Sequence, residues 1–252
     1  MERTGFGDPA RLLPLLWQPS TRVGRTGLTV EGIVEGAVAL VREGGLADLS
    51  MRKLADRLGV GTMTLYAHIP GRAELLDLMV DNAHAATADS YAAHTTSSWR
   101  EGITTIAETN WHLFETHPWL LDVDVSRPPL GPGTTEKYEI ELRLLSSLKV
   151  GEVTMDTTLA LVLEHVRSTA RQALVGQREP HESEARWWAT AGPLLNAYMN
   201  SEHYPYATRV GQAVGEAHGA ASDARHAYEF GLDIITAGLD ALSSDATENT
   251  ET

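Results

Sequence analysis

The sequence of 252 residues contains no cysteine, and only 6% of its residues are aromatic. Without thiols, a disulfide framework, a thiolate zinc site and a cysteine nucleophile are excluded. No stretch approaches the ~18 consecutive apolar residues that span a bilayer. The early apolar run 12–17 contains a proline, follows acidic residues and precedes no small-residue cleavage site, so it does not resemble a secretory signal. We therefore expect a cytoplasmic protein that does not engage a membrane.

Basic residues are also few, because 20 Lys and Arg stand against 34 Asp and Glu, which gives a net charge of −14. A negative protein is repelled by polyphosphate, which argues against nucleic acid as a partner. The imbalance is confined to one part of the chain, since the first 80 residues carry nine basic and nine acidic side chains. The charge therefore argues against DNA contacts only for the part after residue 80.

Strand patterns are scarce, whereas apolar residues recur at helical spacing, for example at Val30, Ile33 and Ala37. Thr29 is suited to cap that first helix and Gly45 to end it. Three further helices are predicted in the first part of the chain, one from residue 50 and two over about 62–68 and 72–88. A capping box at 98–101 starts a longer helix that reaches about residue 116. Later helices are predicted over about 134–150, 154–177, 184–199 and 223–242. Segments 126–133 and 200–221 are predicted to be loops.

The stretch 50–68 carries the most informative motif. Two short helices meet at a turn where Ala55 allows a close crossing and Gly59 accepts a positive φ. Val60 and Leu65 fill the space between the helices. This pattern predicts a helix-turn-helix, whose second helix enters the DNA major groove. A plain corner between two bundle helices is the alternative, but the ending Thr-Leu-Tyr-x-His favours DNA binding.

The expected fold class is all-α, with an N-terminal three-helix DNA-binding domain over 26–72 and a larger helical bundle over 73–242. Residues 1–25 mix glycine, proline, arginine and threonine without periodicity and are expected to form a flexible arm. Residues 243–252 are small, polar and acidic and are expected to form a disordered tail.

Residues 28–80 resemble the DNA-binding domain of TetR-type transcriptional repressors. The resemblance lies in Leu28-Thr29, Gly44-Gly45, the run 49–55 (LSMRKLA), Leu58-Gly59-Val60, the run 64–68 (TLYAH) and Leu75-Leu76-Asp77. More faintly, the segments 98–100, 117–120, 127–133 and 228–232 resemble the C-terminal domain of the tetracycline-repressor branch. The resemblance implies a homodimer that binds double-stranded operator DNA and is released when a small hydrophobic or amphipathic molecule enters the bundle.

Side chains suited to DNA surround the second short helix. The hydroxyls of Thr62, Thr64 and Tyr66 can contact phosphates or base edges, and Arg52 can pair with guanine or with a phosphate. Together with the resemblance, the predicted DNA-facing set is Ser50, Met51, Arg52, Lys53, Gly61, Thr62, Met63, Thr64, Tyr66, His68 and Arg72. Ala67 and Gly61 depart from tetracycline repressors, so their operator sequence is not carried over.

The effector site is predicted on two stretches of the bundle and one tryptophan. Its candidate residues are Asn110, Trp111, Phe114, Trp119, Asp124, Arg127, Glu164, His165, Arg167, Ser168, Arg171 and Trp188. Core packing is the alternative for the aromatic residues, and a solvated or interface face is the alternative for Glu164, Arg167 and Arg171. Ungapped alignment puts Ile106, Asn110 and Asp124 where tetracycline repressors have their contacts, so tetracycline is not the expected effector.

Neither a metal nor a cofactor is expected, because the ten histidines lack metal-ligand spacing. An enzyme would need a nucleophile–base pair, a phosphate loop or metal ligands, and none stands out. Small and branched residues at 162–173 and 234–242 predict a dimer interface of four helices, with intramolecular core as the alternative. The predicted function is a ligand-responsive repressor; a helix-turn-helix activator or DNA-binding protein without an effector is the alternative.

Overall fold

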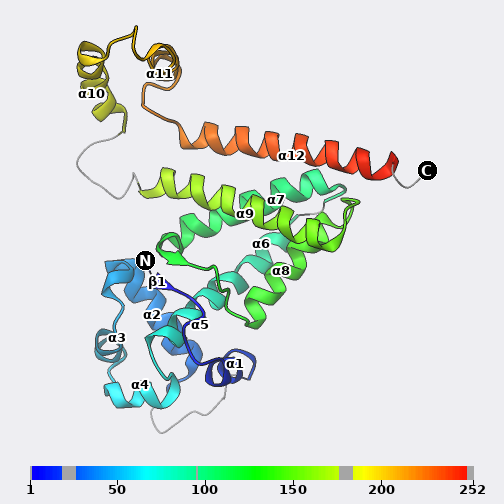
Figure 1. Cartoon of the computed structure of the whole chain (residues 1–252). Coiled ribbons are helices and arrows are strands. Elements are labelled where there is room, and N and C mark those ends of the chain that lie inside the picture. Colours follow the sequence, from blue (N-terminus) through cyan, green and yellow to red (C-terminus); the bar gives the residue numbers. More distant parts are fainter. Residues whose placement is uncertain (1, 19–26, 95, 176–183, 249–252) are drawn as a thin grey trace.

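The computed structural model describes residues 2–18, 27–94, 96–175 and 184–248. Over these residues the protein is almost entirely helical, which confirms the all-α prediction. Figure 1 shows a small helical unit at one end, a larger bundle beside it, and two helices that project from the bundle. None of the described helices is long and apolar enough to cross a membrane.

The small unit contains α2 (Val30–Gly44), the 3₁₀ turn η1 (Leu46–Asp48), α3 (Met51–Leu58) and α4 (Thr62–His68). Thr29 caps α2 by accepting a hydrogen bond from the Gly32 amide at 3.1 Å, as its sequence position predicts. The apolar faces of the three helices meet around the fully buried Ile33, Leu54 and Leu65. These side chains are continuous with the buried residues of the rest of the chain, so the small unit and the bundle share one hydrophobic core.

The bundle contains α7 (Trp99–Thr116), the 3₁₀ turn η2 (Pro118–Asp122), α8 (Pro132–Leu145), α9 (Glu152–Val175) and α12 (Ala224–Glu248). Helix α9 packs against both α7 and α12. Trp99, Ile103 and Ile106 lie on the buried face of α7. Helix α5 (Arg72–Ala85) contacts α2 on one side and α8 on the other, and α6 (Thr87–Ala92) follows it. Helix α5 is thus the physical connection between the small unit and the bundle (Figure 1).

The N-terminal segment differs from the flexible arm that the sequence predicts. Strand β1 (Glu2–Arg3) pairs in parallel with β2 (Val123–Asp124), and α1 (Pro9–Trp17) packs on α5. Leu12 and Leu16 lie one helical turn apart and are both buried, so α1 is stabilised by its contacts with the rest of the protein. Residues 19–25 of the predicted arm lie outside the described residues.

The C-terminal part also corrects two predictions. The predicted loop 200–221 contains α11 (Pro205–His218), which a proline starts and Gly219 ends at φ +62°. Helix α11 lies beside α10 (Glu184–Tyr198), because the Trp188 ring is 3.0 Å from the Cβ position of Gly215. Residues 243–248 belong to α12, contrary to the predicted tail, and 249–252 lie outside the described residues.

Candidate DNA-binding surface and effector cavity

The turn between α3 and α4 has the geometry that the motif predicts. Gly59 adopts φ +67°, and the amide of Val60 donates to the Ala55 carbonyl oxygen at 3.0 Å. Leu65 of α4 is fully buried against α3. Gly61 precedes α4 and supplies no capping side chain, so the first amides of α4 remain available to an anion such as a DNA phosphate.

Most of the predicted DNA-facing residues are accessible to solvent. Arg52, Lys53, Gly61, Met63 and Tyr66 are exposed, and Ser50, Thr62, Thr64 and His68 are partly buried. Met63 is 80% exposed, so its side chain is accessible to a partner. Lys53 forms an ion pair with Asp48 at 2.7 Å, which reduces the charge that it offers to DNA.

Two residues of that set have structural roles instead. Met51 is buried in the core of the small unit. Arg72 turns inward, where its guanidinium donates to the carbonyl oxygen of Leu49 at 2.9 Å and pairs with Glu2. The sequence did not reveal this role, because the partners of Arg72 lie 23 and 70 residues away along the chain.

A cavity of about 520 Å³ lies inside the bundle. It is lined by His84, Asn110, Leu113, Phe114, Leu120, Val125, Pro128, Pro129, Leu130, Thr134, Thr135, Lys137, Tyr138, Glu141, Asp156, Ala160, Leu163, Glu164 and Arg167. The walls thus come from α5, α7, α8, α9 and the segment before α8. This volume falls in the range of ~300–1,000 Å³ that is common for small-molecule sites.

Four of the predicted effector residues line this cavity, namely Asn110, Phe114, Glu164 and Arg167. The other eight lie elsewhere. Among the aromatic residues, Trp111 packs edge-on against Tyr228, Trp119 is buried, and Trp188 packs between α10 and α11. Three charged residues have partners outside the cavity, since Asp124 pairs with Arg3, Arg127 lies near Phe6, and Arg171 lies 3.8 Å from Asp122. His165 contacts the Tyr228 carbonyl oxygen, and Ser168 is exposed. For Trp119 the alternative of core packing is the correct one.

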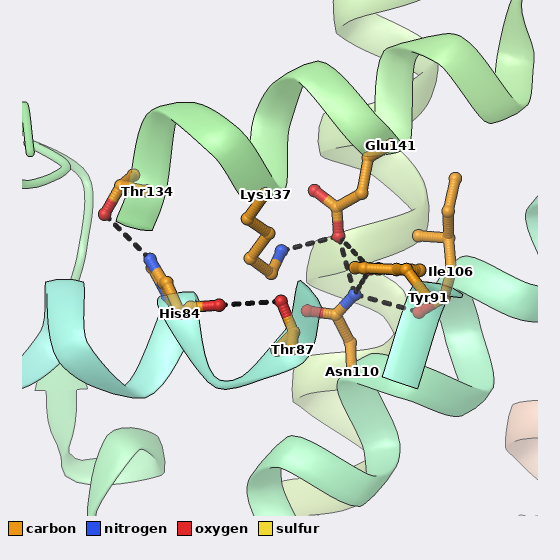
Figure 2. A network of polar contacts seen from close by, with 8 residues as sticks. All are labelled: His84, Thr87, Tyr91, Ile106, Asn110, Thr134, Lys137 and Glu141. Atoms are coloured by element: carbon orange, nitrogen blue, oxygen red, sulfur yellow. Dashed lines mark hydrogen bonds and ion pairs between the residues drawn. The ribbon is translucent and has the colours of Figure 1, made fainter. Parts of the chain in front are cut away.

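The polar side of the cavity is a buried network that the sequence did not reveal. One carboxylate oxygen of Glu141, Oε1, accepts from Lys137 Nζ at 2.5 Å, from Tyr91 Oη at 2.5 Å and from Asn110 Nδ2 at 2.8 Å (Figure 2). Both Glu141 and Lys137 are almost fully buried. Burial and the adjacent Glu141 carboxylate raise the pKa of Tyr91 well above its usual value, so Tyr91 stays a hydrogen-bond donor.

His84 also belongs to the polar side and is uncharged. Its Nδ1 lies 3.0 Å from the hydroxyl of Thr134, as Figure 2 shows. Burial, together with the positive charges of Lys137 and Arg167, lowers the pKa of His84 to about 3. At neutral pH this side chain therefore offers a ligand a neutral imidazole.

Helix α5 and the start of α8 are joined directly beside this histidine. The Asp81 carboxylate accepts the amides of Gly133 at 3.2 Å and Thr134 at 2.8 Å, which satisfies the N-terminus of α8. A Cβ on Gly133 would lie 2.2 Å from the Asp81 carbonyl oxygen, so only glycine allows this approach. Asp81 and His84 are less than one helical turn apart on α5, so the wall of the cavity and the joint between the helices move together.

The described residues contain no group of three or more His, Asp or Glu side chains that could hold a metal ion. The arrangement is that of a binding protein, in which a helix-turn-helix is connected through α5 to a cavity of small-molecule size. These features define the class of ligand-binding helix-turn-helix regulators.

Comparisons with known proteins give the family. Residues 33–79 match the family model of bacterial regulatory proteins of the tetR family, and residues 92–243 match that of the tetracyclin repressor-like C-terminal domain. The chain therefore belongs to the TetR family of transcriptional regulators. The resemblance of both parts, predicted from the sequence, is confirmed.

Individual relatives agree with this assignment. The HTH-type transcriptional repressor DrrR1 of Streptomyces coeruleorubidus is 34% identical over 247 residues, which cover 96% of this chain and 89% of that protein. The structure of Streptomyces coelicolor ActR in complex with actinorhodin has a TM-score of 0.72 at 27% identity and covers 87% of this chain and 98% of that one. SCO7222, a TetR from Streptomyces coelicolor, has a TM-score of 0.66 at 26% identity, with 86% and 99% covered. The predicted class of DNA-binding transcriptional repressor is confirmed.

Proposed function

We propose that this chain represses transcription from an operator and releases it when an amphipathic small molecule occupies the cavity between α7, α8 and α9. The observation that carries the proposal is the joint between Asp81 and the start of α8, which ties the cavity wall to the helix that leads to the DNA-binding unit. The structure of ActR with actinorhodin supports the proposal, because a relative of the same fold holds a ligand.

The lining of the cavity favours an amphipathic ligand. Leu113, Phe114 and Leu163 offer apolar walls, whereas Lys137 and Glu141 offer buried donors and acceptors at one side. A ligand gains from the walls in proportion to the apolar area it buries. It must also replace or extend the bonds of a satisfied polar network, which selects for ligands with matching polar groups.

At the other end of the molecule, α4 is proposed to enter the major groove. Thr62, Thr64 and Tyr66 are then near phosphates and base edges, and Arg52 is near the start of α3. In a dimer, two copies of α4 must match successive major grooves ~34 Å apart. A ligand that shifts α8 also shifts α5 through Asp81, which changes that separation and weakens DNA binding.

TetR-family regulators are dimeric, and the structure offers a surface for such a dimer. Large apolar side chains of α12 are exposed, among them Phe230, Ile234 and Leu242 at 59%, 57% and 54%. The residues of α9 that the sequence places at the interface, such as Val162 and Val166, are instead fully buried within the chain. The proposed interface is therefore carried by α12 together with the outer side of α9, where Leu161 is exposed.

Sedimentation equilibrium tests the interface. We expect the wild-type protein to have the mass of two chains at micromolar concentration. Replacing both Phe230 and Ile234 with glutamate is expected to give a folded monomer, because four like charges would then face each other across the two-fold axis. Val210→Glu, which alters a 53% exposed apolar side chain of α11, outside the proposed interface, is the control that remains dimeric. A wild-type monomer contradicts the proposal.

An electrophoretic shift assay with the DNA upstream of the protein's own gene tests the function. We expect binding at low salt, and release by amphipathic compounds that also raise the melting temperature of the protein in a thermal-shift screen. Failure to bind any fragment at low salt overturns the regulator proposal. DNA affinity that is unchanged by a saturating, stabilising compound favours the alternative of a DNA-binding protein without an effector.

Two substitutions in the same assay assign the DNA surface. Tyr66→Phe is expected to weaken binding to all sequences, because a lost phosphate contact carries no base preference. Arg52→Ala is expected to relax specificity at one base pair by ~1–3 kcal/mol if the contact is bidentate. Lys149→Ala removes an exposed positive charge from the bundle and is the matched control without effect. The reverse pattern would exchange the roles of Tyr66 and Arg52.

A further inference from the structure

The N-terminal segment Glu2–Trp17, here called the strap, contacts both the cavity wall and the DNA-binding unit. It crosses α5, which connects these two parts, and runs beside it (Figure 1). Its contacts fall into three groups, which involve the segment 123–130, helix α5, and Arg72 at the base of the DNA-binding unit.

The first group fixes the strap to the segment that walls the cavity. Besides the pairing of β1 with β2, the buried hydroxyl of Thr4 donates to the Arg127 carbonyl oxygen at 2.6 Å. At the other end of the strap, the indole of Trp17 donates to the Leu130 carbonyl oxygen at 2.7 Å. Leu130 itself lines the cavity, as do Val125, Pro128 and Pro129 of the same segment.

At the β1 end, the strap packs so closely against Arg127 that position 5 requires a glycine. Gly5 adopts φ +71°, which favours glycine, and a Cβ there would lie 2.6 Å from the Cβ of Arg127. The strap and the segment 123–130 therefore pack as one unit, and a displacement of one displaces the other.

The second group fixes the strap to α5. The Gly5 amide donates to Asp77 Oδ1 at 2.9 Å, and the Asp8 amide donates to Glu74 Oε1 at 3.3 Å. Asp77 is fully buried, and its Oδ2 has no hydrogen-bond partner among the described residues. Burial raises the pKa of Asp77 to about 6, and the bond from Gly5 opposes this shift. The strap thus supplies a bond that this carboxylate needs.

The third group reaches the DNA-binding unit. Glu2 forms an ion pair with Arg72, whose guanidinium also donates to the carbonyl oxygens of Leu49 at 2.9 Å and Leu46 at 3.4 Å. These two carbonyls flank the 3₁₀ turn directly before Ser50, the residue that caps α3 by accepting from the Lys53 amide. Arg72 is therefore a positioning residue for the start of α3, and Glu2 holds Arg72 in place.

We propose that the strap is a second connection, which runs beside α5 and meets its first residue Arg72, and by which the cavity wall acts on the position of α3. A ligand that displaces the segment 123–130 would move β1, and with it Glu2 and Arg72. The inference rests on the proposed function, since it assigns a route for the effect of the ligand on DNA binding.

Hydrogen–deuterium exchange of the full chain, without DNA or small molecule, tests the route. Thr4→Val removes a hydroxyl whose acceptors all lie in the segment 123–130, and it leaves the volume of the side chain nearly unchanged. We expect amide exchange over 46–50, in the DNA-binding unit, to become at least threefold faster. Gly5→Ala is expected to do the same more strongly. Arg11→Gln changes an exposed charge on α1 and is the control at the wild-type rate.

The double variant Glu2→Gln/Thr4→Val distinguishes transmission through the strap from general loosening. If the Glu2–Arg72 pair carries the effect, the double variant exchanges over 46–50 no faster than Glu2→Gln alone. Faster exchange confined to 2–17 and 123–130, or an additive effect over 46–50, overturns the inference. The exchange measurement does not depend on the shift assay. A wild-type protein that binds no DNA would refute the proposed function, whereas the exchange rates would still show whether the strap connects the segment 123–130 to the start of α3.

Discussion

Replacing Glu141 with alanine is expected to destabilise the protein by about 3–5 kcal/mol, because it leaves a buried lysine without its counter-charge. Lys137 is only 7% exposed and has its ion pair with Glu141 at 2.5 Å. The hydroxyl of Tyr91 loses its carboxylate acceptor in the same step. Urea unfolding followed by circular dichroism at neutral pH, at one fixed protein concentration, measures the loss.

A double substitution provides the control for this result. Lys137→Met/Glu141→Gln removes both charges and keeps a carbonyl acceptor for Tyr91 and Asn110. Because replacing a buried ion pair by neutral groups of similar volume is often close to neutral, we expect this variant to lie within about 1–2 kcal/mol of the wild type. Equal destabilisation by the single and the double variant would show that packing, and not the buried charge, determines the loss.

Gly133→Ala is expected to cost about 2–3 kcal/mol or more, since the added methyl group meets backbone. Its Cβ would lie 2.2 Å from the Asp81 carbonyl oxygen and 2.9 Å from the Ala85 Cβ, so α8 must move away from α5. The bonds from the start of α8 to the Asp81 carboxylate lengthen as a result. The same unfolding experiment measures the stability of this variant.

Gly151→Ala is the matched control, because no atom lies within 4 Å of the Cβ position there. We expect its free energy of unfolding to differ from that of the wild type by less than about 0.5 kcal/mol, as for ordinary surface substitutions. A Gly133→Ala variant as stable as this control would mean that α5 and α8 have room to separate. The joint at Asp81 would then be too loose to move α5 when α8 moves.

The DNA-binding unit was predictable from the sequence because its signals are local. The cap at Thr29, the left-handed Gly59 and the apolar positions up to Leu65 all lie within 37 residues of one another and agree with a single fold. The N-terminal segment was not predictable, since β1 has two residues and α1 buries only Leu12 and Leu16. Both elements exist through contacts with residues 66 to 123 positions away, which periodicity does not report.

The cavity was predictable only in part, for a related reason. Asn110, Phe114, Glu164 and Arg167 were found because they lie on the two stretches of the bundle that the sequence indicates as the effector site. Lysine and glutamate four residues apart on a helix usually indicate a solvated pair, so Lys137 and Glu141 gave no sign of burial. Only the packing of α6 and α7 over that part of α8 turns the pair into the polar side of a cavity.

The inward turn of Arg72 has a consequence for how the protein searches a genome. Over the described part of α2–α4, Lys53 is also paired with Asp48 and Arg57 with Glu43, so few cations are left to displace the ions that surround DNA. Association with arbitrary sequence gains its free energy mainly from that displacement. We therefore expect the protein to spend little time on unrelated DNA and to slide only short distances along it. We expect it to find its operator mainly by repeated encounters from solution, with an occupancy there that follows its free concentration closely.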